Sequence, residues 1–183
     1  MSFKLVSAFP HERAISTLLT QSLYDGACIK TKLLYVKKKV SLMSWLKSMM
    51  EKEPPEPENP IGTVVIGTLE PDMHLTPKEM VRKALKRAQF KCVDVGKNAP
   101  AANFASQAKA NNADIIAASI NTTLAKNNLP NLMAAIEAEG LKDKVTVMIG
   151  GAAIDKSDAD EVGALFGATK EEAVALAKKA IGK

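Results

Sequence analysis

The sequence predicts an α/β domain built on a parallel sheet and preceded by a short helical section. Strand-like and helix-like segments alternate along residues 61–183, which is typical of a parallel sheet with helical crossovers. The strand segments, such as IIAAS and VTVMIG, are continuous apolar runs, as expected for strands covered on both faces. The chain is 46% hydrophobic but only 4% aromatic, so its core must be aliphatic.

Composition argues against several classes of protein. A net charge of +5 is mild and dispersed, and few aromatic residues could stack on bases, so we expect no nucleic-acid partner. No apolar run approaches a membrane span, and the N-terminus lacks the pattern of a signal peptide. Cys28 and Cys92 lie far apart and form no metal-binding pattern, which indicates a reducing compartment. We therefore expect a cytoplasmic protein.

Residues 1–53 predict a helical hairpin, because apolar residues recur at helical spacing over 12–24 and 27–52, around a break at Asp25–Gly26. Two helices cannot enclose a core, so the hairpin must pack on the main domain or form a homodimer with a second copy. Residues 27–50 carry six lysines and no acid. They predict either a helix for a membrane surface or acidic partner, or the solvated face of a packed hairpin.

Residues 54–60, with the sequence PPEPENP, predict a stiff, extended and solvated linker. The α/β domain follows over 61–183. Its strand signals cover 63–68, 91–95, 114–119, 145–149 and, more weakly, 164–166. Its helix signals cover 77–89, 100–111, 128–139, 158–162 and 170–181. Five such units with right-handed crossovers predict a flavodoxin-like sheet of order 2-1-3-4-5, with ligands bound at the carboxyl ends of the strands.

The loop after the first strand carries Asp72 and His74. A carboxylate that accepts a hydrogen bond from one ring nitrogen leaves the other nitrogen aimed outward as a metal ligand. The next helix has a strong start signal, with Thr76 as N-cap, Pro77 in the first turn and Glu79 completing a capping box. The sequence therefore predicts an imidazole held between a buried strand and a helix.

Two further strand ends reach the same edge. The third strand ends at Ser119, and the short polar side chains of Asn121, Thr122 and Thr123 follow it. The fourth ends at Gly150–Gly151, where the missing β-carbons allow a bulky ligand to approach the backbone. Each feature also has a local interpretation, in which the glycines form only a turn and Ser119 only binds nearby backbone.

These motifs resemble those of the cobalamin-binding domain of methionine synthase and of corrinoid proteins in methyltransferase systems. That family has Asp-x-His-x-x-Gly, Ser-x-Leu and Gly-Gly, separated by spacers of similar length to 78–118 and 122–149 here. The matching residues are Asp72-Met73-His74-Leu75-Thr76-Pro77, Ser119-Ile120-Asn121 and Gly150-Gly151. The resemblance covers about residues 61–183 and implies a cobalamin-binding domain.

The resemblance implies a role for each matching position. His74 would be the lower ligand of cobalt, and Asp72 would hydrogen-bond it. Ser119 would meet the displaced nucleotide base, Thr123 would lie near the lower face of the corrin, and Gly150–Gly151 would line the slot for the nucleotide tail. The full set of expected cofactor-binding residues is Asp72, Met73, His74, Leu75, Ser119, Asn121, Thr123, Gly150, Gly151 and Phe166.

The chain departs from the family pattern at three positions. Pro77 replaces a glycine, and Asn121 replaces a leucine and puts a polar group near the nucleotide. Ala125 stands where relatives often have a hydroxyl that ends a His-Asp-hydroxyl relay, so that relay is truncated here. The N-terminal section is also much shorter than the helical bundle of most relatives, so the role of that bundle is not carried over.

The function that the resemblance implies is that of a corrinoid protein that carries a methyl group between partner methyltransferases. The chain shows no general base or nucleophile, so it is expected to be a non-catalytic subunit whose chemistry belongs to the cofactor. Two alternatives remain open at this stage. One is a cobalamin sensor or storage protein without methyl transfer, and the other is a flavodoxin-like interaction domain without a cofactor.

Overall fold

The computed structural model describes residues 53–182, and the predicted hairpin and its lysines lie outside this part apart from Glu53. The strands are β1 Gly62–Leu69, β2 Phe90–Ala99, β3 Ile115–Ser119, β4 Thr146–Gly150 and β5 Leu165–Phe166. The helices are α3 Thr76–Arg87, α4 Ala101–Ala110, α5 Thr123–Asn127, α6 Leu129–Ala138, α7 Lys156–Val162 and α8 Lys170–Ala180. All strand pairs are parallel and the sheet order is β2-β1-β3-β4-β5, which confirms the predicted flavodoxin-like topology.

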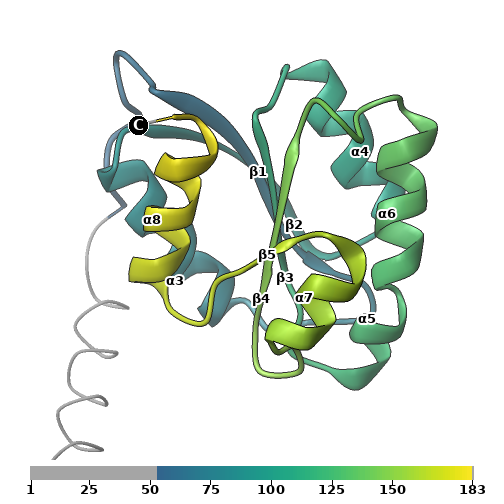
Figure 1. The fold of residues 1–183 in the computed structure, drawn as a ribbon. Helices are drawn as coiled ribbons and strands as arrows, with labels where there is room; N and C mark the ends of the chain where they lie inside the picture. The colour runs from purple at the N-terminus through teal and green to yellow at the C-terminus, as the bar shows by residue number, and fades with distance from the viewer. Residues whose placement is uncertain (1–52, 183) are drawn as a thin grey trace, which may run out of the picture. The chain divides into compact units, whose positions relative to one another are not determined.

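Helices cover both faces of this sheet, as the continuous apolar strands predict. Figure 1 shows α3 and α8 on one face and α4 and α6 on the other. On the α3 and α8 face, Leu85 and Ala177 pack with Val64 and Ile66 of β1. On the other face, Phe104 of α4 belongs to the larger cluster of buried aliphatic side chains. Helices thus cover both faces over the buried strands β1, β3 and β4, and the ends of these strands form the edges of the sheet.

Two elements differ from the sequence prediction. Strand β2 continues past Val95 to Ala99, although Gly96 has a positive φ and the sequence there indicates a turn. Register shifts in the pairing with β1 accommodate this irregularity, so that Leu69 still pairs with Ala99. The short helix α5 was not predicted, and it is started by Thr122, whose hydroxyl oxygen accepts the backbone N–H of Ala125 at 3.1 Å.

The predicted capping box at the start of α3 is wrong. The helix begins at Thr76, and Leu75 takes the N-cap position with helical dihedrals and no side-chain cap bond. The carboxylate of Glu79 does not reach back to the N-cap because it binds Lys78 at 2.9 Å and Arg82 at 2.7 Å. Pro77 still lies in the first turn, where its missing N–H costs nothing.

Gly67 of β1 is buried where side chains of two other elements close over the strand. A β-carbon at this position would overlap the Val95 side chain of β2 and come within 2.9 Å of Phe104 of α4. Only a residue without a side chain fits between them. Gly67 falls inside the strand signal over 63–68, and nothing in the local sequence indicates this packing role.

Residues 53–60, here called the Pro/Glu segment, comprise Glu53 and the predicted linker, and they contact α3 through acidic side chains. Both carboxylate oxygens of Glu53 bind the Arg82 guanidinium, and Glu53 also accepts a hydrogen bond from Lys86 at 2.7 Å. Glu56 pairs with Lys86 as well. These bonds hold the Arg82 pKa above its ordinary value, because the hydrogen bond to Glu53 favours the charged guanidinium. The segment has no helix or strand over residues 53–60. Its carboxylates Glu53 and Glu56 are nevertheless held by ion pairs with α3.

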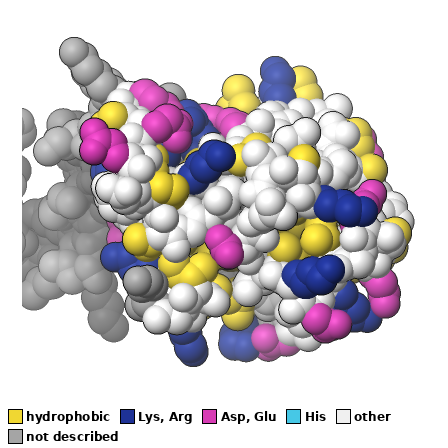
Figure 2. Space-filling view, turned by 90° about the horizontal axis from the view of Figure 1, so that it is seen from above, with side chains coloured by type: hydrophobic (Ala, Val, Ile, Leu, Met, Phe, Trp, Pro, Cys, Tyr) yellow, Lys and Arg dark blue, Asp and Glu magenta, His cyan; other side chains and the backbone are white. Residues whose placement is uncertain are grey.

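The amino edge of the sheet is seen from above in Figure 2, where basic and acidic side chains are interspersed. One hollow of about 290 Å³ lies there, and its lining includes Lys109, Asp114, Glu139 and Lys144. Across residues 53–182, no helix is long and apolar enough to cross a membrane.

Candidate functional site

The carboxyl edge of the sheet brings together the three motifs that lie far apart in the sequence. Parallel pairing sets Thr68, Ser119 and Gly150 side by side at the ends of β1, β3 and β4. The loop after β1 therefore starts next to the loops after β3 and β4. This is the edge at which open α/β sheets bind ligands, and β1 and β3 are the strands at which the chain order reverses.

Asp72 is the central buried group of this edge, with a relative exposure of 1%. Its Oδ1 accepts the backbone N–H of His74 at 2.9 Å and lies 2.6 Å from Nδ1 of the same residue. Its Oδ2 accepts the backbone N–H of Asn121 at 2.6 Å and the side-chain amide of Asn121 at 2.9 Å. The carboxylate thus joins the loop after β1 to the loop after β3.

The pKa of Asp72 reflects two opposing effects. Burial acts to raise the pKa, because it disfavours the charged carboxylate, but the hydrogen bonds from His74 and Asn121 outweigh burial. The net result is a pKa below the ordinary value of an aspartate. Asp72 is therefore a carboxylate acceptor at neutral pH, and Nδ1 of His74 is the donor in the bond between them.

His74 is held on one side and open on the other. Its side chain is 62% exposed, while that of Asp72 is fully buried. The hydroxyl of Thr68 donates to the backbone carbonyl of His74 at 3.2 Å, which fixes the loop from the β1 side. With Nδ1 occupied by Asp72, Nε2 is the ring nitrogen with a free lone pair, as required of a metal ligand.

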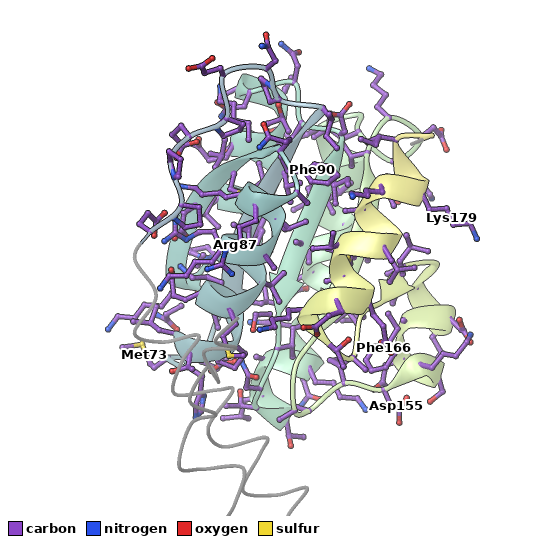
Figure 3. All side chains as sticks on the ribbon, turned by 90° about the vertical axis from the view of Figure 1, so that its left-hand side faces the viewer. Met73, Arg87, Phe90, Asp155, Phe166 and Lys179 are labelled. Atoms are coloured by element: carbon purple, nitrogen blue, oxygen red, sulfur yellow. The ribbon has the colours of Figure 1, made fainter. Side chains whose placement is uncertain are left out.

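Exposed apolar side chains lie at the same edge of the sheet as the imidazole. Within residues 53–182 the exposed large hydrophobic residues are Met73, Leu75 and Leu124, and all three belong to the loops or helix starts at this edge. In Figure 3, Met73 and Phe166 lie toward the lower end of the domain, opposite Phe90 and Lys179. An exposed imidazole with apolar neighbours suits a large, flat and largely apolar ligand.

Several polar residues after β3 make hydrogen bonds within the protein. The amide of Asn121 binds Asp72, the hydroxyl oxygen of Ser119 at 3.1 Å and the backbone N–H of Ala152 at 3.3 Å. Thr123 is the first residue of α5, and the preceding Thr122 donates its hydroxyl to the carbonyl of Pro71 at 3.2 Å. Ser119 retains its own hydroxyl hydrogen for a further partner.

The glycine pair is required by the fold. A β-carbon on Gly150 would overlap the carbonyl oxygen of Gly167, and one on Gly151 would overlap that of Ile120. Gly151 also has φ +127°, which residues with a side chain rarely adopt. The turn interpretation of these glycines therefore has a physical basis in the fold, and their contact with a nucleotide tail stays a prediction.

The last expected positions can also be placed. Phe166 lies on β5 opposite Ile149 of β4, half-buried against the larger core cluster. Ala125 of α5 is fully buried. Because alanine has no hydroxyl, this position does not extend the hydrogen-bond chain from His74 and Asp72. The second oxygen of Asp72 is nevertheless occupied, because Asn121 supplies two donors to it.

Sequence reasoning missed Lys78 and Asp94. Lys78 has a relative exposure of 2%, and its Nζ binds the two carboxylate oxygens of Asp94 at 2.8 and 2.6 Å. This ion pair ties the first turn of α3 to β2, just after the loop that carries His74. A lysine on an amphipathic helix is usually solvated, so its sequence alone offered no signal for burial.

These residues fit a metal ion that is bound together with a macrocycle, because the macrocycle supplies most of the ligands. Within residues 53–182 no group of three or more His, Cys, Asp or Glu side chains could hold a bare metal ion. His74 instead offers a single nitrogen, backed by Asp72 and set among apolar side chains. Such a donor set would suit a metal ion whose other ligands come from a macrocycle, with His74 as the protein residue that would hold it.

The fold and this edge define a class of protein, namely a flavodoxin-like domain with one oriented and exposed imidazole at the carboxyl edge of its sheet. Comparison with known families makes the class specific. The profile of the family described as "B12 binding domain" matches residues 62–177. The chain therefore belongs to the B12-binding domain family, and its cofactor is cobalamin.

Curated relatives agree with this assignment. Trimethylamine corrinoid protein 1 of Methanosarcina acetivorans is 37% identical over 133 residues, which are 72% of this chain and 61% of that protein. Dimethylamine corrinoid protein 3 of Methanosarcina mazei is 38% identical over 120 residues, which are 65% of this chain and 72% of that protein. The chain thus spans about three fifths of the length of the first of these relatives.

Solved structures show the same fold. A cobalamin-binding protein from Desulfitobacterium hafniense superposes with a TM-score of 0.63 at 27% identity, covering 65% of this chain and 58% of that one. The monomethylamine corrinoid protein of Methanosarcina barkeri gives a TM-score of 0.62 at 25% identity, covering 67% of this chain and 60% of that one. The alternative of an interaction domain without a cofactor loses its support.

Proposed function

We propose that this protein carries a methyl group between partner methyltransferases, with His74 as the lower ligand of the cobalt. The observation that carries the proposal is the exposed imidazole of His74, oriented by the buried carboxylate of Asp72 at 2.6 Å. The bound corrinoid supplies the cobalt centre on which the methyl group travels. The protein supplies the orientation of one ligand and a surface for the corrin.

The other residues of the edge have complementary parts in this proposal. Met73 and Leu75 offer exposed apolar surface to the corrin, beside the imidazole. Ser119 and Thr123 stand at the end of β3 and the start of α5, where the lower side of the cofactor would lie. The remaining members of the proposed cofactor-binding set are Asp72, Asn121, Gly150, Gly151 and Phe166.

The relatives suggest the class of methyl donor. Those compared above are named for trimethylamine, dimethylamine and monomethylamine. We therefore propose a methylated amine as the source of the methyl group, delivered by a partner methyltransferase. We propose a second methyltransferase as the partner that receives the methyl group.

We propose residues 1–53 as a dimerisation or cap segment, 54–60 as the linker and 61–183 as the cobalamin-binding domain. We also propose the cytoplasm as its compartment, because the cysteine pattern predicts a reducing environment.

Reconstitution tests the proposal in two stages. The full chain is loaded with cobalamin, separated from free cofactor and examined by visible spectroscopy. It is then mixed with methyltransferases from the same genome and labelled methylamines, and transfer of the label to an acceptor is measured. Cobalamin binding with label transfer supports the carrier. Cobalamin binding without transfer in any pairing supports the sensor or storage protein.

A further inference from the structure

Asn121 lies where the loops after three strands meet. Its Nδ2 donates to Oδ2 of Asp72 at 2.9 Å and to Oγ of Ser119 at 3.1 Å. Its Oδ1 accepts the backbone N–H of Ala152 at 3.3 Å. Both amide hydrogens and the carbonyl oxygen are therefore engaged, and the partners belong to the ends of β1, β3 and β4.

This network allows one orientation of the amide. A flipped amide would point its carbonyl oxygen at the Asp72 carboxylate and its hydrogens at the N–H of Ala152, and both contacts would be repulsive. The carboxylate is constrained in turn. Two donors of Asn121 bind its Oδ2, and two donors of His74 bind its Oδ1, so Asp72 has one orientation as well.

We propose that Asn121 is a positioning residue that aims the imidazole of His74 through Asp72 and connects that aim to the loop after β4. A leucine at this position, as in the family pattern, would keep the backbone N–H bond to Asp72 but lose both side-chain links. The loop after β4 begins at Gly151. A ligand lodged between the β3 and β4 loops would therefore contact the same hydrogen-bond network that orients the imidazole. This inference rests on the proposed role of His74 toward the cofactor.

The closing experiment reads His74 directly in the full chain without cofactor. His11→Gln leaves His74 as the one histidine, so its ring nitrogens can be followed by ¹⁵N NMR. In this background we expect His74 to carry its proton on Nδ1, protected from exchange by Asp72. Asn121→Leu should speed exchange of that proton by about tenfold or more and mix the two neutral tautomers, since a charge-assisted network is broken.

Two further variants make the result specific. Asn121→Ala removes the same three side-chain hydrogen bonds without the bulk of leucine, so it should also speed exchange of the Nδ1 proton, and it decides the question if Asn121→Leu does not fold. Asn128→Leu is the matched control. Asn128 anchors the same loop by donating to the carbonyl of Glu70 at 2.9 Å without touching Asp72, so this variant should leave the His74 ring unchanged.

The outcomes separate this inference from the proposed function. An unchanged His74 ring in both Asn121 variants, or an equal change in Asn128→Leu, would overturn the positioning role. With cobalamin added, Asn121→Leu should shift the visible spectrum in the direction of His74→Ala, which a purely structural role would not do. A wild-type chain that fails to bind cobalamin would refute the proposed function, and the NMR readout would still decide the role of Asn121.

Discussion

The Oδ1 atom of Asp72 fixes both the ring and the backbone of His74. It lies 2.6 Å from Nδ1 of the imidazole and accepts the backbone N–H of the same residue at 2.9 Å. The two residues are separated by one position, so this pair of bonds closes a small local ring in the chain. The buried carboxylate and the exposed imidazole form a rigid unit whose free end faces solvent.

Replacing His74 by alanine should shift the visible spectrum of the bound cobalamin, because the proposed lower ligand is removed. Affinity should fall by no more than about tenfold, since the proposed contacts with the corrin and the nucleotide tail do not involve His74. Asp72→Asn should produce a smaller shift, and His11→Ala should produce none. Identical spectra for the wild type and His74→Ala at neutral and acidic pH would exclude His74 as the cobalt ligand.

Gly67→Ala should lower the free energy of unfolding by about 1–3 kcal/mol, because the added methyl group collides with Val95 and Phe104 in a packed core. Denaturant unfolding monitored by circular dichroism measures the effect. Gly167→Ala is the control, since its β-carbon would meet nothing closer than 3.4 Å. An equal loss in both variants would contradict the packing argument.

Cys92 should react slowly with thiol reagents in the folded protein. Burial raises the pKa of its thiol from 9.0 to about 12, and the thiolate is the reactive form. In a Cys28→Ser background, modification at pH 8 should be about a thousandfold slower in the folded protein than after unfolding in urea, following the shift in thiolate fraction. Equal rates in the two states would show that the thiol is not protected by burial.

Glu53→Gln should weaken the anchoring of the Pro/Glu segment. Hydrogen bonds from Arg82 and Lys86 lower the Glu53 pKa from 4.5 to about 2, so its stabilisation is complete above pH 4.5 and is lost as the pH falls toward 2. The carboxylate is 46% exposed and therefore screened, so the loss in unfolding free energy at pH 7 should stay within about 1 kcal/mol.

The pH and salt dependence of that loss in unfolding free energy shows whether the ion pairs of Glu53 cause it. The difference between Glu53→Gln and the wild type should disappear near pH 2 and shrink at high salt. Glu58→Gln, an exposed glutamate of the same segment, serves as the control. A difference that persists at pH 2 would point to a cause other than the ion pairs.

Removing the N-terminal section should abolish self-association, if residues 1–53 form the predicted hairpin and pair with a second copy. Analytical ultracentrifugation compares the full chain with a chain that begins at Glu51, where the second compact unit starts. The shortened chain keeps Glu53 and its bonds to α3. A full chain that sediments as a monomer at all concentrations would exclude the dimer.

Much of the fold follows from local sequence, because its signals are short-range. Apolar runs and helical periodicity predicted all five strands and most helices, and the alternation of the two predicted the sheet order. The predictions were wrong where a local signal competes with strand pairing or with an ion pair. Gly96 indicates a turn, yet β2 continues to Ala99 because register shifts keep it bonded to β1. Glu79 suits a capping box, yet Lys78 and Arg82 bind it instead.

Strand ends and spacing in the sequence were enough to place Asp72, His74 and Ser119 at the carboxyl edge. The bonds that join these residues depend on how the folded segments meet. The bonds from Asn121 to Asp72 span 49 positions, the link to Ala152 spans 31, and the buried pair of Lys78 with Asp94 depends on how α3 lies on β2. Hydrogen bonds need partners within about 3 Å, and no periodicity in a chain encodes a distance between segments that meet only after folding.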